Sequence, residues 1–429
     1  MSEPPEGRAL APSGPPPEAA RAGNAAPQPE RPAVERREPA ATRVGCNLLW
    51  LVPGTVGGSE TAIVSLLREI GDHQPEDVAL LLYVLDAFAD VYPDLADRFP
   101  TRTVPLTGRL KPLRVAAENT WLASQAHRDG LDLVHHMNAV LPAVRRTPGI
   151  VTVHDLQPFD MPANFHPVKR AYVHRTVPRS VRKSRLVLTP SEFVRGAVVD
   201  RFGIAPERVR ATRWGVEAPS TQVAVGQAQA RYGLPRRWFV YPAVTWPHKN
   251  HELLIRAFAT VAAQEHDVVL VLTGGEAQSE DQVRAQIAGT GLRGRVRRTG
   301  LIPRNDMLAI VRGAVALTFP SRYEGFGLPV LEAMSLGTPV LAGDAAALPE
   351  VVGDGGRLID PDDADAWGAA MLQLLHDGDE RERLVATGHR RAATFSWATT
   401  ARETLAAYRD AVAGDDSGDD TGEIQEVAS

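Results

Sequence analysis

The stretch that decides the fold is Ala316-Leu-Thr-Phe-Pro-Ser-Arg-Tyr-Glu324-Gly-Phe-Gly-Leu-Pro-Val-Leu-Glu332-Ala-Met-Ser-Leu-Gly-Thr-Pro-Val-Leu341. An apolar run at each end, 315–319 and 339–341, is typical of a buried strand. Between them, Pro329 suits the first position of a helix over 330–336, which a glycine ends. Strand, glycine loop and helix together indicate a place where backbone N–H groups at a helix N-terminus bind a phosphate.

Two glutamates make this stretch more specific. Glu324 stands in the loop and Glu332 in the first turn of the predicted helix. The helix dipole favours a carboxylate in that turn, so we expect Glu332 to be ionised. An ionised carboxylate accepts hydrogen bonds from two sugar hydroxyls, such as those of a ribose. The pattern predicts a site for a nucleotide sugar; the alternative is an ordinary strand–loop–helix turn with a solvated acid at each end.

The same stretch resembles the E-x(7)-E signature of the retaining glycosyltransferases with the GT-B fold, the large family 4 group. The resemblance runs from about Val44 to Tyr408 and is most specific from Ser321 to Pro349. It implies an α/β fold in which two Rossmann-like domains face each other across a cleft. The donor nucleotide is then expected on the second domain and the acceptor on the first.

Composition is that of an ordinary soluble globular protein. The 429 residues suffice for two domains with tails, and 44% are hydrophobic and 23% charged. A net charge of -5 argues against a nucleic-acid partner. Cys46 is the only cysteine, which excludes an intrachain disulfide, and we expect it to be buried in a protein of the reducing cytoplasm. Neither a membrane span nor a signal peptide is predicted.

The arrangement of apolar runs predicts five segments. The proline-rich start and the acidic end cannot bury enough apolar surface to fold, so we expect both to be disordered. Between them strands and helices alternate twice, which indicates two Rossmann-like domains with a poorly patterned linker at 218–226. In the resembled fold the last helix crosses back to the first domain. The predicted segments are a tail 1–43, a first domain 44–217, a second domain 218–395, a crossing helix 396–413 and a tail 414–429.

Two strand ends of the first domain supply candidate site residues. Gly57 and Gly58 follow the first strand without the G-x-G-x-x-G spacing of a dinucleotide site, and a tight turn is the alternative. His154 follows the strand 150–153, and ligands of doubly wound sheets lie beyond such strand ends. The resemblance implies that His154 lies near the reacting sugar and that the glycine turn approaches the phosphates or the acceptor. A structural histidine is the alternative, and Asp155 is expected to orient His154 or to cap the loop.

Lys249 precedes a predicted helix over 251–263, for which Asn250 suits the N-cap. A cation is disfavoured at a helix N-terminus, and a bound diphosphate would reverse that effect; a lysine that reaches solvent is the alternative. The resembled family has a lysine here that binds the donor diphosphate. It usually also has an arginine a few residues earlier, which is absent from Ala243-Val-Thr245, so another arginine or His248 would have to replace it.

Three further motifs bear on the function. The segment 168–185 carries seven cations and no acid, which indicates either a solvated helix face or attraction to anionic lipid or to a phosphate-bearing acceptor. Asp360-Pro-Asp362 has the D-x-D form that metal-dependent transferases use. Its position before a helix over 364–376 favours a loop, so we expect no metal site. The pair His135-His136 is expected to be structural.

The function implied is transfer of a hexosyl group from a nucleoside-diphosphate sugar to a hydroxyl of a glycan, a lipid-linked molecule or a small molecule. The resemblance implies retention at the anomeric carbon, with no metal and no cofactor. The residues around Trp246 and 153–156 look most like bacterial mannosyltransferases that use GDP-mannose. Glucosyl and rhamnosyl donors are alternatives. A GT-B-fold sugar-nucleotide epimerase and a non-catalytic nucleotide-sugar-binding protein also stay open.

Each site residue has an expected role under this resemblance. Glu324 is expected to bind the sugar hydroxyls and stabilise developing positive charge, Glu332 to bind the ribose, and His154 to position the reacting sugar. The remaining donor-binding candidates, expected to bind the diphosphate, are Lys249, Gly325, Phe326, Gly327 and Leu328. A peripheral contact with the anionic inner face of the membrane is a further hypothesis.

Overall fold

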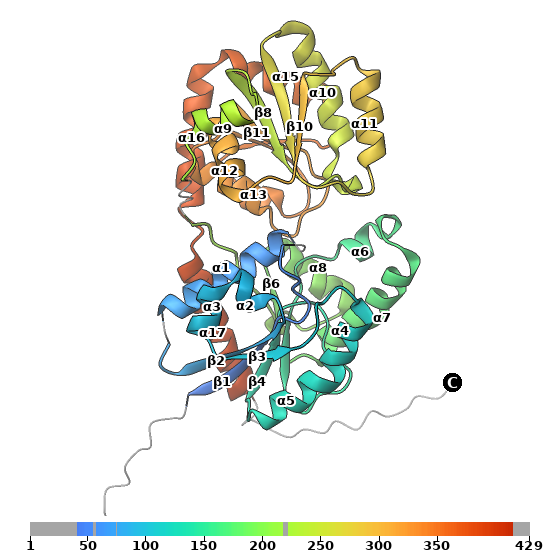
Figure 1. Cartoon of the computed structure of the whole chain (residues 1–429), viewed down its shortest axis with the longest axis vertical. Helices are drawn as coiled ribbons and strands as arrows, with labels where there is room; N and C mark the ends of the chain where they lie inside the picture. Colours follow the sequence, from blue (N-terminus) through green and yellow to red (C-terminus); the bar gives the residue numbers. More distant parts are fainter. Residues whose placement is uncertain (1–40, 55–56, 74, 218–221, 415–429) are drawn as a thin grey trace, which may run out of the picture. The chain divides into compact units, whose positions relative to one another are not determined.

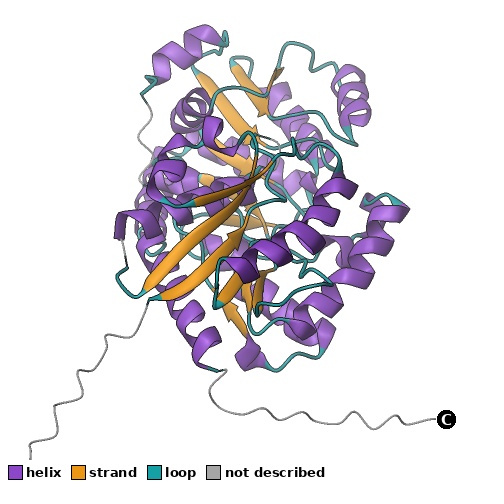
Figure 2. Cartoon of the chain, turned by 60° about the horizontal axis from the view of Figure 1, so that its bottom comes forward, coloured by secondary structure: helices purple, strands orange, loops and turns teal. Residues whose placement is uncertain are grey.

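The computed structural model describes residues 41–54, 57–73, 75–217 and 222–414. The chain folds into two α/β domains, each built on a parallel sheet (Figure 1). Figure 2 shows helices flanking the strands of the sheets. Of the two predicted tails, residues 1–40 and 415–429 lie outside the described residues.

The first sheet has seven strands in the order β3-β2-β1-β4-β5-β6-β7. Every neighbouring pair is parallel. The strand order reverses at β1, which pairs with β2 on one side and β4 on the other, and ligands of such sheets bind beyond the carboxyl ends at that point. The strands are β1 Thr42–Asn47, β2 Val78–Leu85, β3 Thr101–Val104, β4 Leu133–His136, β5 Gly149–Thr152, β6 Val187–Thr189 and β7 Val209–Ala211.

Helices connect these strands. Where helix α4 continues into α5, the turn between them, Glu118–Leu122, is π-helical. Ser191 caps α8, because its side chain accepts a hydrogen bond from the N–H of Val194. The helices are α1 Gly58–His73, α2 Phe88–Val91, α3 Pro93–Arg98, α4 Lys111–Ala117, α5 Ala123–Arg128, α6 Gln157–Asp160, α7 Pro167–Lys183 and α8 Glu192–Phe202.

The second sheet has six parallel strands in the order β10-β9-β8-β11-β12-β13. Its order reverses at β8, and the glycine loop follows the neighbouring strand β11. The strands are β8 Arg237–Pro242, β9 Val268–Thr273, β10 Val296–Gly300, β11 Ala316–Phe319, β12 Val340–Gly343 and β13 Arg357–Ile359. The helices are α9 Val225–Arg231, α10 His251–Gln264, α11 Glu280–Gly289, α12 Arg304–Gly313, α13 Leu328–Ser335, α14 Leu348–Val352, α15 Ala364–His376 and α16 Gly378–Ala392.

The last helix, α17 (Trp397–Ala413), belongs to the core of the first domain. It packs against α1, β1 and β4, beside which Figure 1 shows it. Trp397, Leu405 and Tyr408 are buried there among side chains of the first sheet. The hydroxyl of Tyr408 lies 2.9 Å from Nδ1 of His135, so a buried hydrogen bond joins α17 to β4.

Several predicted element bounds are wrong, and the reasons are local. The helix after the glycine loop begins at Leu328, two residues early, because Gly327 adopts a left-handed conformation with φ 111° that starts the helix. The predicted linker 218–226 overlaps α9; its residues 218–221 lie outside the described residues. Asn250 adopts a left-handed conformation at the start of α10 but makes no side-chain cap there.

Candidate functional site

A large pocket is lined by residues of both domains, which belong to one compact unit beginning at Ala41. Its volume is about 980 Å³. It brings together most of the predicted site residues: Gly57, Gly58, His154, Lys249, Glu324, Gly325, Phe326, Gly327 and Leu328. Glu332 does not line it, so the pocket unites the phosphate and sugar candidates but not the ribose candidate.

Gly325 is the point of closest approach between the glycine loop and the first domain. A Cβ at this position would lie 2.0 Å from the carbonyl oxygen of His154, so only glycine fits. The hydroxyl of Ser191, the cap of α8, donates a hydrogen bond of 2.7 Å to the carbonyl of Gly325. The loop is thereby held against the end of β5, which places Glu324 and His154 in one pocket.

Tyr323, just before Glu324, strengthens the same contact. Its hydroxyl donates to Asp160 at 2.7 Å and accepts from the N–H of Leu156 at 3.2 Å. Glu350 of α14 accepts from the N–H groups of Glu192 and Phe193, the first two residues of α8. A carboxylate at a helix N-terminus is favoured by the dipole. These contacts were not predicted, because nothing in the sequence pairs residues so far apart.

The backbone of the glycine loop offers hydrogen-bond donors to the pocket. Within the part of the chain that the structure describes, the N–H groups of Gly325, Phe326, Gly327 and Leu328 have no partner. They lie just before and at the start of α13, whose dipole adds positive potential. Such an arrangement can bind an anionic group such as a phosphate.

Lys249 and Glu324 form an ion pair in this pocket. Nζ of Lys249 lies 2.6 Å from Oε1 of Glu324, and the two side chains are only 18% and 14% exposed. Lys249 also lies over the ring of Phe319, 5.4 Å from its centroid. The lysine is therefore not one that extends into solvent, and its charge is balanced by the glutamate predicted to bind sugar.

His154 is an uncharged imidazole at the end of β5. Burial lowers its pKa to about 4, although the hydrogen bond to Met137 opposes this effect. Nε2 donates to the carbonyl of Met137 at 3.1 Å, which leaves Nδ1 as an acceptor. Nδ1 is buried and, among the described residues, has no partner. The rings of Trp50 and Trp214 lie 5.8 and 5.7 Å from the imidazole, so its orientation is well constrained.

Asp155 caps the loop, which is one of its two expected roles. Its carboxylate accepts a 3.0 Å hydrogen bond from the N–H of Gln157. No hydrogen bond joins it to His154 in the portion of the chain described.

Glu332 is buried, and it does not lie in the first turn of the helix, where it was predicted. It is the fifth residue of α13, beyond the first turn, so the dipole argument does not apply. Burial raises its pKa, and Arg304, 2.6 Å away, lowers it. Arg304 was not predicted as a site residue. It is the first residue of α12, and a cation at a helix N-terminus is the feature that identified Lys249 as a candidate.

The cations that line the pocket are Lys249 and two lysines of the first domain, Lys111 and Lys169. Lys169 belongs to the basic segment 168–185, and other cations of that segment have structural roles. Arg179 and Arg185 donate to the carbonyls of Leu141 and Ala411. His248 also lines the pocket, but burial and then Lys249 lower its pKa to about 3, so it adds no charge at neutral pH.

The segment from Asp360 to Asp362 forms a loop before α15, as predicted. The carboxylate of Asp360 accepts from the N–H of Asp362, which forms a turn, and Asp363 caps α15. Within the described ranges, no three His, Cys, Asp or Glu side chains gather where they could hold a metal ion.

Cys46 is buried, as predicted, and burial raises its pKa to about 12. None of the described helices combines the length and apolar character that crossing a bilayer requires.

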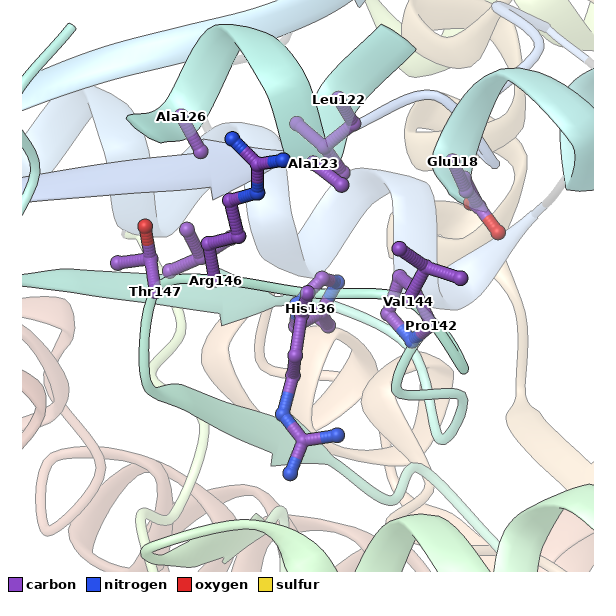
Figure 3. A pocket seen from close by; sticks show the side chains of 11 residues that line it. Glu118, Leu122, Ala123, Ala126, His136, Pro142, Val144, Arg146 and Thr147 are labelled. Carbon is purple, nitrogen blue, oxygen red and sulfur yellow. The ribbon is translucent and has the colours of Figure 1, made fainter. Parts of the chain in front are cut away.

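A second, smaller pocket lies between the π-helical turn and β4 (Figure 3). Glu118 and His136 are among its lining residues. Both are buried beside Asn47, whose side-chain nitrogen lies 3.1 Å from Nδ1 of His136 and 3.5 Å from Glu118. Burial raises the pKa of Glu118 to about 7 and lowers that of His136 to about 3. His136 is thus structural, as expected.

Two family models match the chain, one in each domain. The first, described as Glycosyltransferase Family 4, covers residues 56–218, and the second, Glycosyl transferases group 1, covers 232–391. The O-antigen chain mannosyltransferase B of Escherichia coli is 33% identical over 291 residues, which are 66% of this chain and 76% of the relative. The chain belongs to the family 4 glycosyltransferases.

Further comparisons agree with this family. The MMP alpha-(1->4)-mannosyltransferase of Mycolicibacterium hassiacum is 32% identical to this glycosyltransferase over 239 residues, 55% of this chain and 56% of the relative. The crystal structure of Anabaena HepE in complex with UDP and glucose superposes with a TM-score of 0.69 at 19% identity, and covers 86% of this chain and 100% of HepE. The fold of this glycosyltransferase is therefore GT-B, as predicted.

Proposed function

We propose that this glycosyltransferase transfers a mannosyl group from GDP-mannose to a hydroxyl acceptor, with retention at the anomeric carbon and without a metal. The observation that carries the proposal is the convergence of Lys249, Glu324, His154 and the N–H groups of Gly325–Leu328 on one pocket. The choice of donor is supported by two relatives that are mannosyltransferases by name.

The leaving diphosphate is stabilised by protein groups in this proposal. Lys249 and the N–H groups of Gly325–Leu328 take the negative charge that develops as the bond between the sugar carbon and the phosphate oxygen breaks. The acceptor oxygen bonds to that carbon on the same face, and the leaving phosphate oxygen takes the acceptor's proton. No separate base is needed.

Glu324 and His154 act on the sugar. When the diphosphate binds Lys249, the carboxylate of Glu324 becomes available to accept sugar hydroxyls and to stabilise the positive charge that develops at the ring. Nδ1 of His154 is an acceptor without a protein partner among the described residues, suited to a sugar hydroxyl. Its low pKa keeps it uncharged, so it does not repel the developing cation.

Glu332 binds the ribose in this proposal, and its ion pair with Arg304 favours the ionised form. The Arg304 contact opposes the rise in pKa that burial imposes on Glu332. Because Glu332 does not line the pocket, the nucleoside would extend from Leu328 and Pro329 along α13.

Substitutions separate these roles kinetically. We expect Glu332→Ala mainly to raise the donor KM, because ribose contacts are equal in ground and transition states. His154→Ala is expected mainly to lower kcat, by about 100-fold, because it misplaces the reacting sugar. Initial rates over a range of donor concentrations give both constants. Near-normal kinetics in both variants would contradict the site.

A panel of nucleotide sugars tests the function as a whole. The full chain is incubated with GDP-mannose, UDP-glucose and dTDP-rhamnose, and released nucleotide and isomerised sugar are measured by chromatography. Slow release of GDP alone supports the proposal, and release from another donor changes the sugar assigned. An isomerised sugar indicates an epimerase instead, and binding without turnover indicates a non-catalytic protein. Lys249→Met serves as the inactive control.

The acceptor side supports a second proposal, contact with an anionic membrane. Near the N-termini of α4 and α7, Leu110 is 64% and Val168 72% exposed, and Arg170 and Arg175 of α7 are also exposed. Exposed apolar side chains among cations suit the surface of an anionic bilayer. Flotation with vesicles of phosphatidylcholine, with and without phosphatidylglycerol, tests this contact. Equal recovery from both would contradict it, and a Leu110→Ser, Val168→Ser variant should float less.

A further inference from the structure

Asn250 joins Lys249 to the helix α10 through an uncommon backbone conformation. The 3₁₀ turn Pro247–Lys249 ends at this residue, and α10 begins directly after it. Asn250 has φ 59° and ψ 38°, and in the described ranges Ala346 is the only other non-glycine residue with a positive φ. Few residues other than glycine adopt this left-handed conformation, and asparagine is among those that tolerate it best. The angle between α10 and the turn that carries Lys249 therefore depends on the residue at position 250.

The side chain of Asn250 does not cap α10, because it is bonded to other loops. Its Nδ2 donates to the carbonyls of Pro320 and Pro361 at 3.2 and 2.6 Å, and its Oδ1 accepts from Arg322 at 2.7 Å. Carbonyls only accept and a guanidinium only donates, so these partners determine which end of the amide is the oxygen. The residue is only 5% exposed. Buried hydrogen bonds thus tie Asn250 to the loops that follow β11 and β13.

The main chain around Lys249 is held by a second set of contacts. Tyr241, a buried residue of β8, donates its hydroxyl hydrogen to the carbonyl of Lys249 at 2.7 Å. The same hydroxyl lies 3.1 Å from Oγ of Ser321. The N–H of Arg322 donates to the carbonyl of His248 at 2.9 Å. Because Ser321 and Arg322 lead directly into the glycine loop, the turn that carries Lys249 is bonded to the start of that loop.

These contacts restrict where the ammonium group of Lys249 can lie. Its Nζ is 2.6 Å from Glu324, and its side chain is largely buried. An ammonium on a flexible four-carbon chain binds a ligand more tightly where its backbone is fixed, because less freedom is lost on binding. Asn250 itself does not line the pocket, so it can affect a bound ligand only through its neighbours.

We propose that Asn250 is a positioning residue of the donor site, which holds Lys249 and the glycine loop on the same phosphate. The inference rests on the proposed function, because that function assigns the sugar-bearing phosphate to Lys249 and the loop. The left-handed backbone sets the direction of Lys249, and the three side-chain hydrogen bonds fix its distance from the loop. A cation held in advance needs no rearrangement as negative charge grows on the leaving phosphate.

Comparison of GDP with GMP tests this role, because GMP lacks the phosphate that Lys249 is proposed to bind. Both nucleotides are titrated calorimetrically into the full chain. We expect Asn250→Ala to weaken GDP binding about 10-fold, as when one charged contact is lost, and to change GMP binding by less than about 2-fold. Asn250→Gly keeps the left-handed backbone but loses the side-chain bonds, so it should weaken GDP binding by about 3-fold.

Gly233→Ala is the matched control. Gly233 follows α9 of the second domain, has φ 60°, and a Cβ at this position would meet nothing within 4 Å. The variant strains the same backbone conformation without touching the contacts of Asn250. It should therefore lower the melting temperature and leave the ratio of GDP to GMP affinity unchanged. A fall in that ratio as large as the one in Asn250→Ala would contradict the inference.

A double-mutant cycle with Lys249→Met shows whether Asn250 acts through the lysine. If it does, Asn250→Gly weakens GDP binding no further once Lys249 has been replaced. Additive losses would overturn the inference, and so would equal weakening of GDP and GMP by Asn250→Gly. This variant keeps the test decisive even if Asn250→Ala does not fold, since glycine adopts the left-handed conformation readily.

Chemical labelling separates this inference from the proposed function, because it needs no nucleotide. The rate at which acetic anhydride acetylates Lys249 is followed by mass spectrometry. We expect a several-fold rise in Asn250→Gly and no change in Gly233→Ala. If labelling responds in this way but GDP does not bind, the donor assignment is wrong and the positioning role is retained. If GDP binding depends on Lys249 but neither labelling nor the affinity ratio depends on Asn250, the positioning role is wrong.

Discussion

Lys249 and Glu324 neutralise each other in the pocket. The charge of Glu324 therefore opposes binding of the diphosphate, although turnover requires it in the proposed mechanism. A diphosphate must displace Glu324 before it can bind Lys249. We therefore expect Glu324→Gln to bind GDP about 5-fold more tightly, a gain of about 1 kcal/mol, because the lysine charge is no longer balanced. The same variant should lose most of its turnover, because the carboxylate that stabilises the sugar cation is gone.

Calorimetric titration of GDP and initial-rate measurements on the same preparation check both effects. Lys249→Met is the matched variant and should weaken GDP binding about 10-fold or more. If Glu324→Gln binds GDP more weakly than the unchanged chain, the ion pair does not compete with the diphosphate and this reasoning is wrong.

Glu118 couples the stability of the first domain to pH. Burial raises its pKa to about 7, whereas an unfolded glutamate titrates near 4.3. Between these values the folded protein retains a proton that the unfolded chain has lost. Its stabilising contribution is complete below about pH 4, falls as pH rises, and is lost above about pH 7.

Glu118→Gln should remove this dependence. We expect the variant to be more stable than the unchanged chain at pH 8, on the order of 2 kcal/mol, and similar to it near pH 4. Urea denaturation at both pH values measures the difference. Glu382→Gln, an exposed position of α16, is the control. Equal stability of the Glu118 variant and the unchanged chain at pH 8 would show that Glu118 is not held protonated.

The glycine loop between β11 and α13 shows how one element serves both domains. We expect Gly325→Ala to lower turnover by about 100-fold, because its Cβ would contact the carbonyl of His154 and move the loop by about 1 Å or more. Gly289→Ala, at the end of α11 where a Cβ meets nothing within 4 Å, is the matched control. Turnover and thermal denaturation are measured on both, and equal turnover would contradict the close contact.

Much of this element was predictable from its own residues. Apolar runs predicted the two strands, and glycines with a proline predicted the loop and helix between them. The start of α13 was misplaced, because the left-handed conformation of Gly327 cannot be distinguished in sequence from an ordinary loop glycine. The dipole argument for Glu332 then failed with it, since the extra residues put Glu332 beyond the first turn.

Contacts between distant segments were beyond the reach of the sequence. Asn250 looked like an N-cap, yet its side chain donates to the carbonyls of Pro320 and Pro361. Nothing local shows that Arg304 reaches Glu332, or that Lys111 and Lys169 share a pocket wall. Such pairs arise from the order of strands in the two sheets, which local periodicity does not specify.

At the scale of the whole molecule, α17 ties the end of the described chain to its beginning. Tyr408 binds Nδ1 of His135 in the first-domain core. We expect Tyr408→Phe to be destabilised by about 1–3 kcal/mol, because the buried imidazole loses this partner. The melting temperature should fall by a few degrees, about 2–4 °C per kcal/mol for a domain of this size.

Differential scanning calorimetry measures this effect. Tyr172→Phe, on the exposed face of α7, removes a hydroxyl without removing a core contact and should leave the melting temperature unchanged. An unchanged melting temperature in Tyr408→Phe would show that α17 adds little to the first domain.

The place of α17 also governs the order of events during synthesis. The core of the first domain includes side chains from about 190 residues after its last strand, so it remains incomplete on the ribosome while the second domain is made. At 5–20 residues per second this interval lasts roughly 10–40 s. Throughout it the nascent first domain exposes the apolar surface that α17 later covers, and exposed apolar surface of this kind is prone to aggregation unless chaperones bind it.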